Sequence, residues 1–544
     1  MTSTLTWGEL RRQVAALAAT FTAAGVGSGD RVVAYLPDTA ESVVAFLAAA
    51  TVGATWASCG QDYAPPAALD RLGQLEPSVL LAADGYYFAG REHDLRAAAA
   101  EVRAGLPSLR LAVAVPRLGL RPGLDEAADW LPWSVATAGE HPFEPLAVPF
   151  DHPLWVVFSS GTTGKPKGIV HGHGGVVLEH LKTLGLHMDA GPGDVFWWYT
   201  SPSWMMWNYR TSGLLVGATI VTYDGSPAHP TTDQLWRIVA RHAVTIAGTS
   251  PGYVTACGKA GADPAREHDL SALRTLGCTG STVPPESYYW VGEHVGERVQ
   301  LVSTTGGTDV VTGFAGGAPT VPVWPGEISV ACLGVALDAF DESGHSVRDD
   351  VGELVVTEPM PSMPVSFWND PDGERYRAAY FAVFPGVWRH GDWITITGRN
   401  SVLMHGRSDS TLNRHGVRMG SAEIYHAVEQ VPEVDEALIV GVEQPGGGYW
   451  MPLFVTLTPG AVLDGDLKAR INDAIRTIVS PRHVPDEIIL APGVPHTRTG
   501  KKLEIPVKRL LAGDDPSRVA DLKAVDDPAV FDWYRRLASA RAQR

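Results

Sequence analysis

Hydrophobic positions along the first part of the chain alternate between helical and strand spacing. Residues 5–26 place apolar side chains at helical intervals, and the apolar run 30–37 that follows is typical of a short buried strand. The same order recurs around the apolar runs 78–83 and 109–116. Strands that alternate with helices predict parallel sheets wrapped by helices. The pattern therefore indicates an α/β fold.

A second block of this kind begins near residue 154, and the pattern changes after about residue 301. From there to residue 407, short strands separated by Gly and Pro predict a small antiparallel subdomain. The segment 421–442 then reads as a helix followed by a strand. We therefore expect a large N-terminal domain of two helix-wrapped sheets plus a small β subdomain, residues 1–407, and a small C-terminal α+β domain, residues 411–544. The strands predicted in the second block are 154–161, 218–225, 244–250 and 274–281.

Composition narrows the class of protein. The 544 residues are too many for one core, and with 45% hydrophobic and 19% charged residues the chain reads as globular rather than disordered. The 43 basic against 60 acidic residues leave a net charge of −17, which argues against a nucleic-acid surface. A small anionic ligand in a local basic site is compatible with this charge.

Cysteine usage and the apolar runs bear on the compartment. The four cysteines form no C-x-x-C pair, so neither a zinc site nor a disulfide framework is indicated, and a reducing cytosol fits best. The first ten residues lack the basic start and apolar core of a signal peptide, and we expect a cytoplasmic protein. The uncharged run 43–60 is diluted by Ala, Gly, Thr and Ser, which predicts a buried helix and turn rather than a membrane span. The cysteines are Cys59, Cys257, Cys278 and Cys332.

The stretch VVFSSGTTGKPKGIVH, residues 156–171, is the densest chemical motif. A Walker P-loop needs Ser or Thr directly after its lysine, whereas Lys165 is followed by Pro166, so that interpretation fails. What remains is a loop rich in glycine and hydroxyl groups that also carries Lys167. Such a loop can hold phosphates through backbone N–H groups, hydroxyls and a point charge. A flexible surface loop is the alternative.

Further motifs follow this loop in a fixed order. Together with it they resemble the adenylate-forming superfamily, which includes acyl-CoA synthetases, luciferases and peptide-synthetase adenylation domains. The resemblance covers roughly residues 6–510 and is closest to the acetoacetyl-CoA synthetases, through SWMMWNY, GGTDVVTGFAGG, PSMPVSFWNDPDGERYRAAYF and GRSDSTLNRHGVRMG. The other motifs are TGST with Gly280, Ser281 and Thr282, GGTD with Gly306 to Asp309, HGD ending at Asp392, GRSD with Arg407 and Asp409, and TRTGKK with Lys501.

The resemblance implies activation of an acid by ATP, in which the carboxylate attacks the α-phosphorus and a thiol such as that of CoA then displaces AMP. Charge builds on phosphate oxygens, so catalysis rests on positioning and electrostatics. By this resemblance Asp309 would bind Mg²⁺, Asp392 would accept the ribose hydroxyls, and Arg407 and Arg418 would contact phosphate or ribose. The phosphate loop would be Ser160, Gly161, Thr162, Thr163, Gly164 and Lys167, and the other nucleotide contacts Gly280, Ser281, Thr282, Gly307 and Thr308.

The resemblance also assigns a catalytic lysine and a hinge. By the match to T-x-x-G-K, Lys501 would reach the reacting carboxylate and α-phosphate, whereas the adjacent Lys502 would be a bystander. Catalysis would then fall to Lys501, Asp309, Lys167 and Arg407. The two domains would have to close to bring Lys501 to Asp309, and residues 408–410, with Asp409, would form the hinge for a domain rotation.

The acid and thiol sites follow from the same resemblance. Trp204 would form a wall of the acid pocket, and Met205 and Met206 would present adaptable apolar surface. In acetyl-CoA synthetases a tryptophan shortens the pocket at the position of Gly306, so we expect an acid larger than acetate. For CoA, the resemblance points to Arg476 at the 3′-phosphate, Arg91 as a weaker candidate, and Gly416 in the pantetheine tunnel.

Two departures from the family leave other functions open. The chain opens directly on MTSTLTWGEL, whereas acetoacetyl-CoA synthetases carry about a hundred residues before the matching helix, and Ser203 and Tyr209 add hydroxyls near the pocket. One alternative is an ATP-dependent diazotase, which would activate nitrite for attack by an aryl amine. Another is a non-catalytic nucleotide-binding protein, although such a protein would be expected to have lost its catalytic charges. The sequence leaves the oligomeric state open.

Overall fold

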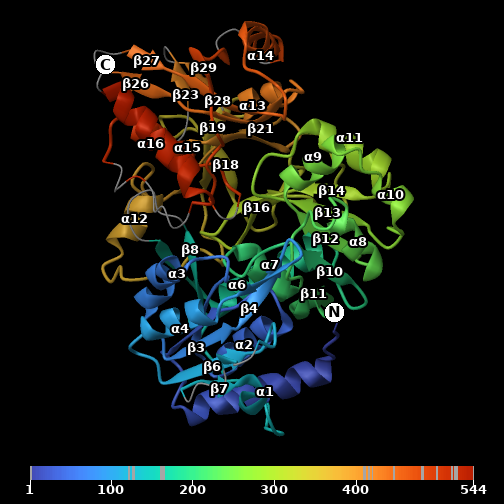
Figure 1. Cartoon of the computed structure of the whole chain (residues 1–544), viewed down its shortest axis with the longest axis vertical. Helices are drawn as coiled ribbons and strands as arrows, with labels where there is room; N and C mark the ends of the chain where they lie inside the picture. The colour runs from blue at the N-terminus through green and yellow to red at the C-terminus, as the bar shows by residue number, and fades with distance from the viewer. Residues whose placement is uncertain are drawn as a thin grey trace.

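Two α/β blocks, a β subdomain and a C-terminal domain follow one another along the chain (Figure 1). The C-terminal domain, orange to red in the figure, lies at the opposite end of the molecule from the first α/β block, in blue. The computed structural model describes residues 3–120, 123–124, 129–159, 166–408, 412–414, 417–419, 421–444, 448–478, 483–497, 500–515, 519 and 525–542.

The first block is an eight-stranded sheet covered on both faces. Neighbouring residues of one central strand point to opposite sides: Val32 packs in the core beneath α1 and α2, and Val33 in the core beneath α3 and α4. This alternation is that of a strand buried on both faces. In spatial order the strands are β20 (Ser366–Phe367), β9 (Lys167–Gly172), β8 (Pro153–Ser159), β2 (Thr55–Cys59), β1 (Arg31–Tyr35), β3 (Val79–Ala83), β6 (Leu111–Val115) and β7 (Leu131–Pro132). The helices are α1 (Trp7–Ala23), α2 (Ala40–Thr51), α3 (Pro65–Leu72), α4 (Arg96–Ala104), α5 (Trp133–Ala136) and α6 (His173–Lys182), and a small hairpin joins β4 (Gly85–Phe88) to β5 (Arg91–Asp94).

One edge of this sheet is antiparallel, which corrects the expectation of parallel strands throughout. Strand β8 pairs parallel to β2 but antiparallel to β9, with Ser159 opposite Lys167. The segment between these two residues is too short for the crossover that a parallel pair needs, whereas it suffices for a hairpin. The predicted phosphate loop therefore connects the two strands of a hairpin.

The second block is a five-stranded, all-parallel sheet. The strand predicted at 154–161 to open this block is β8 of the first sheet instead, so that part of the prediction was wrong. One face packs on α8, α9 and α11, while Phe196 and Trp198 on the other face share a core with the first sheet. Helix α7 is buried along its whole length in that shared core, whereas α6 packs one face on it through Val176 and leaves Leu178 exposed. The strands are β11 (Thr219–Val221), β10 (Val195–Trp198), β12 (Ile246–Thr249), β13 (Thr275–Cys278) and β14 (Gln300–Ser303), and the helices α7 (Met205–Thr211), α8 (Gln234–Arg241), α9 (Pro251–Lys259), α10 (Pro264–Glu267) and α11 (Pro285–His294).

The β subdomain consists of short antiparallel strands, as the Gly- and Pro-rich pattern predicts. Its core contains Phe314, Leu354 and Trp388. The three-stranded sheet is β15 (Thr305–Gly307), β16 (Thr312–Gly316) and β17 (Val330–Ala331). The four-stranded sheet is β18 (Leu337–Phe340), β19 (Val351–Val356), β21 (Trp388–Ile396) and β22 (Val402–Arg407), with α12 (Glu374–Tyr380) beside it.

The C-terminal domain has its own cores, which its helices build against a three-stranded sheet. It meets the large domain through α13 and β22, and the His426 imidazole lies 3.8 Å from the Glu286 carboxylate. The strands are β23 (Leu412–Arg414), β24 (Val417–Met419), β25 (Val434–Ile439), β26 (Val442–Gln444), β27 (Gly448–Trp450), β28 (Pro452–Leu457) and β29 (Glu487–Leu490). The helices are α13 (Ser421–Glu429), α14 (Gly465–Ile478), α15 (Glu504–Leu511) and α16 (Pro528–Ala542).

The uncharged run 43–60 forms most of α2 and then strand β2, so the helix was predicted and the strand was missed. Trp56 in β2 is buried between α2 and α7, where its ring stacks on that of Trp207. None of the described helices is both long enough and apolar enough to cross a bilayer. All four cysteines are buried as free thiols.

Candidate active site

A cavity of about 820 Å³ opens where the large domain meets the C-terminal domain. Its walls come from the end of β8 and from the segments just after β10, β13 and β14, at the carboxyl ends of parallel strands, where α/β sheets bind ligands. Lys501 closes it from the C-terminal domain. The predicted site residues that the structure brings together around this cavity are Lys167, Trp204, Met205, Met206, Gly280, Ser281, Thr282, Gly306, Gly307, Thr308, Asp309, Asp392 and Lys501.

Asp309 and Lys167 form an ion pair in the wall of the cavity. The Lys167 ammonium lies 3.0 Å from Asp309 Oδ1, and the Tyr380 hydroxyl donates a short hydrogen bond to the same oxygen. The ammonium also lies 4.3 Å from the centre of the Phe367 ring, a cation–π distance. Strand β9 supplies the lysine, the turn after β15 the aspartate, and α12 the tyrosine. Three distant segments therefore converge on one carboxylate.

The environment keeps this carboxylate charged. Burial alone would raise the pKa of Asp309, but the Lys167 ammonium, the His390 imidazole and the Tyr380 hydroxyl together hold it well below its usual value. Conversely, burial and the neighbouring Asp309 charge raise the pKa of Tyr380. At neutral pH the cluster thus contains an ionised aspartate, a lysine and a neutral tyrosine that donates its proton.

A row of buried histidines supports the segment that carries Asp309. His171 Nε2 donates to the Asp309 carbonyl at 2.9 Å, and His180 Nε2 donates to the Val311 carbonyl at 2.7 Å. Val311 has a φ of +49°, a left-handed conformation that a β-branched residue rarely adopts. Further along, His187 Nδ1 donates to the Gly317 carbonyl at 2.8 Å. The histidines therefore fix the backbone on which Asp309 sits.

Helix α7 forms the apolar end of the cavity. Met205, Met206 and Tyr209 line it, while Arg210, one turn after Met206, is fully buried. Arg210 Nη1 donates to Asp38 Oδ2 at 2.6 Å, so an ion pair inside the core holds the helix in place. The predicted apolar acid pocket thus coincides with a rigidly anchored helix.

Gly306 lines the cavity, but backbone packing also requires a glycine there. A Cβ at this position would lie 2.0 Å from the Thr312 carbonyl oxygen, because β15 pairs closely with β16 around a register shift. The close pairing of β15 with β16 therefore requires a glycine at position 306, in addition to any need for space in the pocket.

The two adjacent lysines near the end of the chain differ in surroundings. Lys501 lies at the cavity in a tight turn, in which the Thr497 N–H donates to the Lys501 carbonyl at 2.7 Å. Lys502 Nζ instead donates to the Ala437 carbonyl at 2.8 Å and lies 3.9 Å from the centre of the Tyr425 ring. Only the first of the two is placed to meet a ligand in the cavity.

Other predicted residues lie elsewhere or are not described. Arg91 is exposed on β5, and Arg476 on α14 is half-exposed and paired with Asp473, so neither lines the cavity. Arg407 is the last residue of β22, and Arg418 lies in β24. The side chains of both fall outside the described part of the chain. The predicted site residues that lie outside the described ranges are Ser160, Gly161, Thr162, Thr163, Gly164, Asp409 and Gly416.

Several residues of the site were not predicted from the sequence. Tyr380 and Phe367 contact the Lys167–Asp309 pair, and the His390 ring packs edge-on against Phe314 near Gly307. His390 precedes the predicted Asp392 by two residues in the HGD motif, which was a usable signal. Tyr380 lies in the motif PSMPVSFWNDPDGERYRAAYF, but its role depends on α12 folding back to a residue 71 positions earlier, which the motif does not show.

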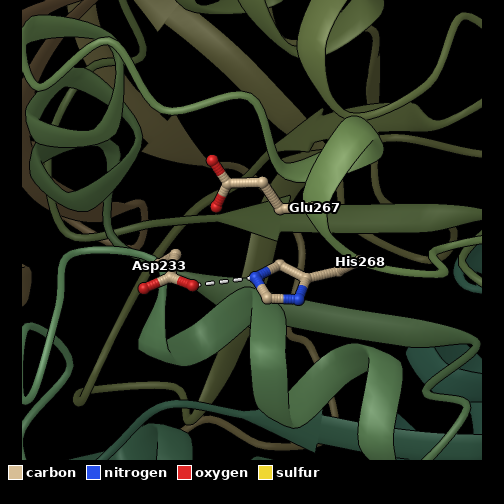
Figure 2. A group of neighbouring side chains, drawn as sticks. All are labelled: Asp233, Glu267 and His268. Carbon is tan, nitrogen blue, oxygen red and sulfur yellow. Dashed lines mark hydrogen bonds and ion pairs between the residues drawn. The ribbon is translucent and has the colours of Figure 1, made fainter.

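A second group of possible metal ligands lies away from the cavity: Asp233, Glu267 and His268 (Figure 2). His268 Nε2 lies 2.8 Å from Asp233 Oδ2, and Arg237 donates to the same oxygen at 3.1 Å. Burial would raise the pKa of Asp233, but hydrogen bonds from Thr231, His268 and Arg237 lower it to about 2. The protein's own donors thus satisfy this carboxylate, which ties the start of α8 to the end of α10.

Comparisons with known proteins agree over nearly the whole chain. The family described as AMP-binding enzyme matches residues 1–363, and the AMP-binding enzyme C-terminal domain matches residues 423–501. The acetoacetyl-coenzyme A synthetase of Rhizobium meliloti (strain 1021) is 42% identical over 99% of this chain and 82% of its own length. The acetoacetyl-CoA synthetase of Mus musculus is 41% identical over 98% of this chain and 80% of its own length.

A solved structure gives the same result. The acetoacetyl-CoA synthetase from Streptomyces lividans superposes with a TM-score of 0.95 at 53% identity, and the match covers 99% of this chain and 82% of that one. The reported relatives are acid–CoA ligases and give no support to the diazotase alternative. The chain therefore belongs to the AMP-binding enzyme family of adenylate-forming, AMP-producing acid–thiol ligases.

Proposed function

We propose that this protein activates a short β-keto acid, acetoacetate in the first instance, and transfers it to CoA. The reaction has two steps. The carboxylate attacks the α-phosphorus of ATP, which forms the acyl-adenylate as the bond to the pyrophosphate oxygen breaks. The CoA thiol, after loss of its proton, then attacks the acyl carbon and releases AMP. The similarity to acetoacetyl-CoA synthetases over nearly the full chain supports this choice of acid and thiol.

The observation that carries the proposal is that Lys167, Asp309 and Lys501 border one cavity. In the first step negative charge increases on the phosphate oxygens, and fixed positive charges stabilise it without reorganisation. We assign Lys501 to the oxygens between the carboxylate and the α-phosphorus, and Lys167 to the terminal phosphates. Gly280, Ser281 and Thr282 would line the adenine site, and Asp392 would accept hydrogen bonds from the ribose.

Mg²⁺ fits the donor set at Asp309. This ion prefers oxygen ligands and is bound in nucleotide sites by one or two carboxylates together with phosphates and water. Asp309 offers an ionised carboxylate at the cavity wall, in which the described hydrogen bonds engage Oδ1. When bound, the ion would neutralise phosphate charge, while Lys167 and Tyr380 hold the carboxylate in position.

The acid would occupy the apolar end of the cavity. Trp204, Met205 and Met206 offer a wall and adaptable thioether surface to a short chain. The anchoring of α7 through Arg210 keeps this surface fixed. We expect selection for size to arise here rather than at the charged end.

CoA would approach after pyrophosphate has left. We assign Arg476 to its 3′-phosphate, Arg91 to a secondary contact and Gly416 to the pantetheine passage, all by resemblance. Residues 408–410 would act as a hinge that carries the C-terminal domain, residues 411–544, between the two steps. The meeting of the domains beside the cavity, through α13 and β22, is compatible with such a pivot.

Product analysis tests this proposal. The purified protein is incubated with ATP, Mg²⁺, acetoacetate and CoA, and in parallel with ATP, Mg²⁺, nitrite and an aminoaryl acid. We expect acetoacetyl-CoA, AMP and pyrophosphate in equal amounts in the first reaction and no ATP consumption in the second. A diazonium product in the second, without thioester in the first, would overturn the proposal.

A further inference from the structure

A buried arginine at the cavity pairs with no acidic side chain that the structure describes. Arg71, in the last turn of α3, is 6% exposed and lines the same cavity as Lys167 and Lys501. Its Nη1 donates to the Ala67 carbonyl at 2.9 Å, and its guanidinium lies 4.5 Å from the centre of the Tyr63 ring. Among the described residues no carboxylate pairs with it.

This arrangement is unusual for a buried charge. Charged side chains are rarely buried unless they are paired, because desolvation is costly. Arg210, which is also deeply buried, follows that rule through its 2.6 Å contact with Asp38. One neutral carbonyl and one aromatic face leave most of the five N–H donors of Arg71 without a described acceptor.

Helix α3 brings Arg71 near the loop end of the β8–β9 hairpin. Three residues after it, Gln74 Nε2 donates to the carbonyl of Pro166, the residue before Lys167 in the predicted phosphate loop, at 3.0 Å. Arg71 also borders a small side pocket whose lining includes Phe158 from β8, Thr308, Trp204 and Met205. Arg71 therefore lies beside the hairpin that carries the predicted phosphate loop and next to the acid pocket.

Arg71 would add to this site a positive charge that no described carboxylate offsets. The positive charge of Lys167 is already offset by Asp309 at 3.0 Å. Released pyrophosphate is a polyanion whose oxygens suit the planar donor set of a guanidinium, which can bind two of them at once. Arg71 supplies this donor set.

We propose that Arg71 binds the terminal phosphates of ATP and holds the pyrophosphate that leaves. The proposal rests on the proposed function, since it names a further residue of the same site. CoA also carries phosphates, so the experiment must distinguish binding of pyrophosphate by Arg71 from binding of the CoA phosphates. No covalent step is involved.

The test compares Arg71→Met and Arg71→Lys with a matched control, Arg103→Met. Arg103 also ends a helix, α4, and lies 5.8 Å from the centre of the Trp130 ring, but it pairs with Asp129 and does not line the cavity. The readout is acid-dependent exchange of labelled pyrophosphate into ATP. We expect Arg71→Met to raise the KM for pyrophosphate about 10- to 100-fold, since hydrogen bonds to charged groups are typically of this strength. Arg71→Lys should fall in between, and Arg103→Met should match the wild type.

A structural role would produce a different pattern. In Arg71→Met we expect the KM values for the acid and for CoA to stay within about twofold of the wild-type values. The urea midpoint of unfolding should equal that of the wild type within error. An unchanged KM for pyrophosphate in folded Arg71→Met would overturn the proposal. So would an increase confined to the KM for CoA, which would assign the cation to the CoA phosphates, or an equal increase in every KM together with lost stability.

Calorimetric titration with magnesium pyrophosphate makes the test independent of turnover. If the wild type shows no acid-dependent exchange, the proposed function fails, yet weaker pyrophosphate binding by Arg71→Met than by Arg103→Met would still support the assignment of Arg71. Equal binding by the two variants would overturn it.

Discussion

The charges of single residues at the cavity are set by their neighbours rather than by their exposure. Asp309 is ionised because Lys167, His390 and Tyr380 outweigh the cost of its burial. The neighbours of Lys501 and Lys502 also differ. Lys501 borders the cavity, whereas Lys502 packs on Tyr425 and its ammonium donates to a backbone carbonyl. Adjacent residues of one type can therefore be assigned opposite roles.

This contrast gives a prediction for the two lysines. Lys501→Ala should slow acyl-adenylate formation by about 10²-fold, roughly 3 kcal/mol, because it removes a charge needed mainly in the transition state. ATP affinity and the free energy of unfolding should be nearly unchanged. The measurement is single-turnover pyrophosphate release with ATP and acid but no CoA.

Lys502→Ala serves as the control for Lys501→Ala. It should lower the free energy of unfolding, since it leaves the buried site on Tyr425 empty, while the adenylation rate of the folded protein stays close to that of the wild type. An unchanged adenylation rate in Lys501→Ala, or equal losses in both variants, would remove Lys501 from the catalytic assignment.

Sequence reasoning reached the site residues that lie within short motifs and missed those that depend on the fold. Lys167, Asp309 and Asp392 sit in recognisable loops, whereas Tyr380 and Arg71 reach the cavity only because α12 and α3 pack beside it. Tyr380 lies in a motif that carries the resemblance, but neither that motif nor the sequence around Arg71 shows which side of its helix meets the cavity. The motif match also could not reveal that packing of β16 requires a glycine at Gly306.

At the scale of elements, β9 and α6 each present one histidine to the segment between β15 and β16, and the helical turn η3 (Thr183–His187) presents one to the residue after β16. Burial lowers the pKa of both His171 and His180 to about 4. Both imidazoles are therefore neutral at physiological pH, and each donates one N–H to a carbonyl. The support that His171 and His180 give to this backbone therefore depends on neutral imidazoles.

The depressed pKa values predict lower stability in acid. Because both groups bind a proton more weakly in the folded than in the unfolded protein, stability is complete above the unfolded pKa near 6.5 and falls as the pH drops toward 4. At pH 5 the loss should be roughly 2 kcal/mol for each histidine. Urea unfolding at pH 7.5 and pH 5 measures it.

His180→Gln separates this effect from general acid sensitivity. The variant should be less stable at pH 7.5, because the bond to Val311 is lost or weakened, but it should lose less additional stability between pH 7.5 and pH 5 than the wild type. The same pH-dependent loss in both proteins would show that His180 does not titrate as described.

Most elements were predictable because their hydrophobic period is clear. Helix α1, strands β1, β3 and β6, and the helix–strand pair α13 and β25 lie where the pattern puts them. The antiparallel β8–β9 edge was not predicted, since hydrophobic alternation carries no information on strand direction. Strand β2 was taken for a turn because Ala, Ser and Cys dilute its apolar character.

At the scale of the whole molecule, the cavity is complete only where the two domains meet. Lys501 comes from the C-terminal domain, and the nucleotide and acid contacts come from the large one. A site divided in this way can be rearranged by a rotation between the domains. The proposed hinge residue Asp409 lies outside the described residues, so its role stays a prediction.

Asp409→Pro tests the hinge. Proline fixes φ near −65°, which should restrict rotation, so thioester formation should fall more than adenylation. Rapid-quench measurement of the two half-reactions provides the comparison, with Asp409→Ala as the control that keeps torsional freedom. Equal loss of both half-reactions in Asp409→Pro would indicate that the pivot lies elsewhere.

The central claim is that the acid carboxylate itself attacks the α-phosphorus, and isotope transfer tests it most directly. Acetoacetate labelled with ¹⁸O in both carboxylate oxygens is converted with ATP and CoA, and the products are analysed by mass spectrometry. The account predicts one ¹⁸O in AMP, none in pyrophosphate, and one in the thioester carbonyl. Unlabelled AMP, or label in pyrophosphate or inorganic phosphate, would contradict it.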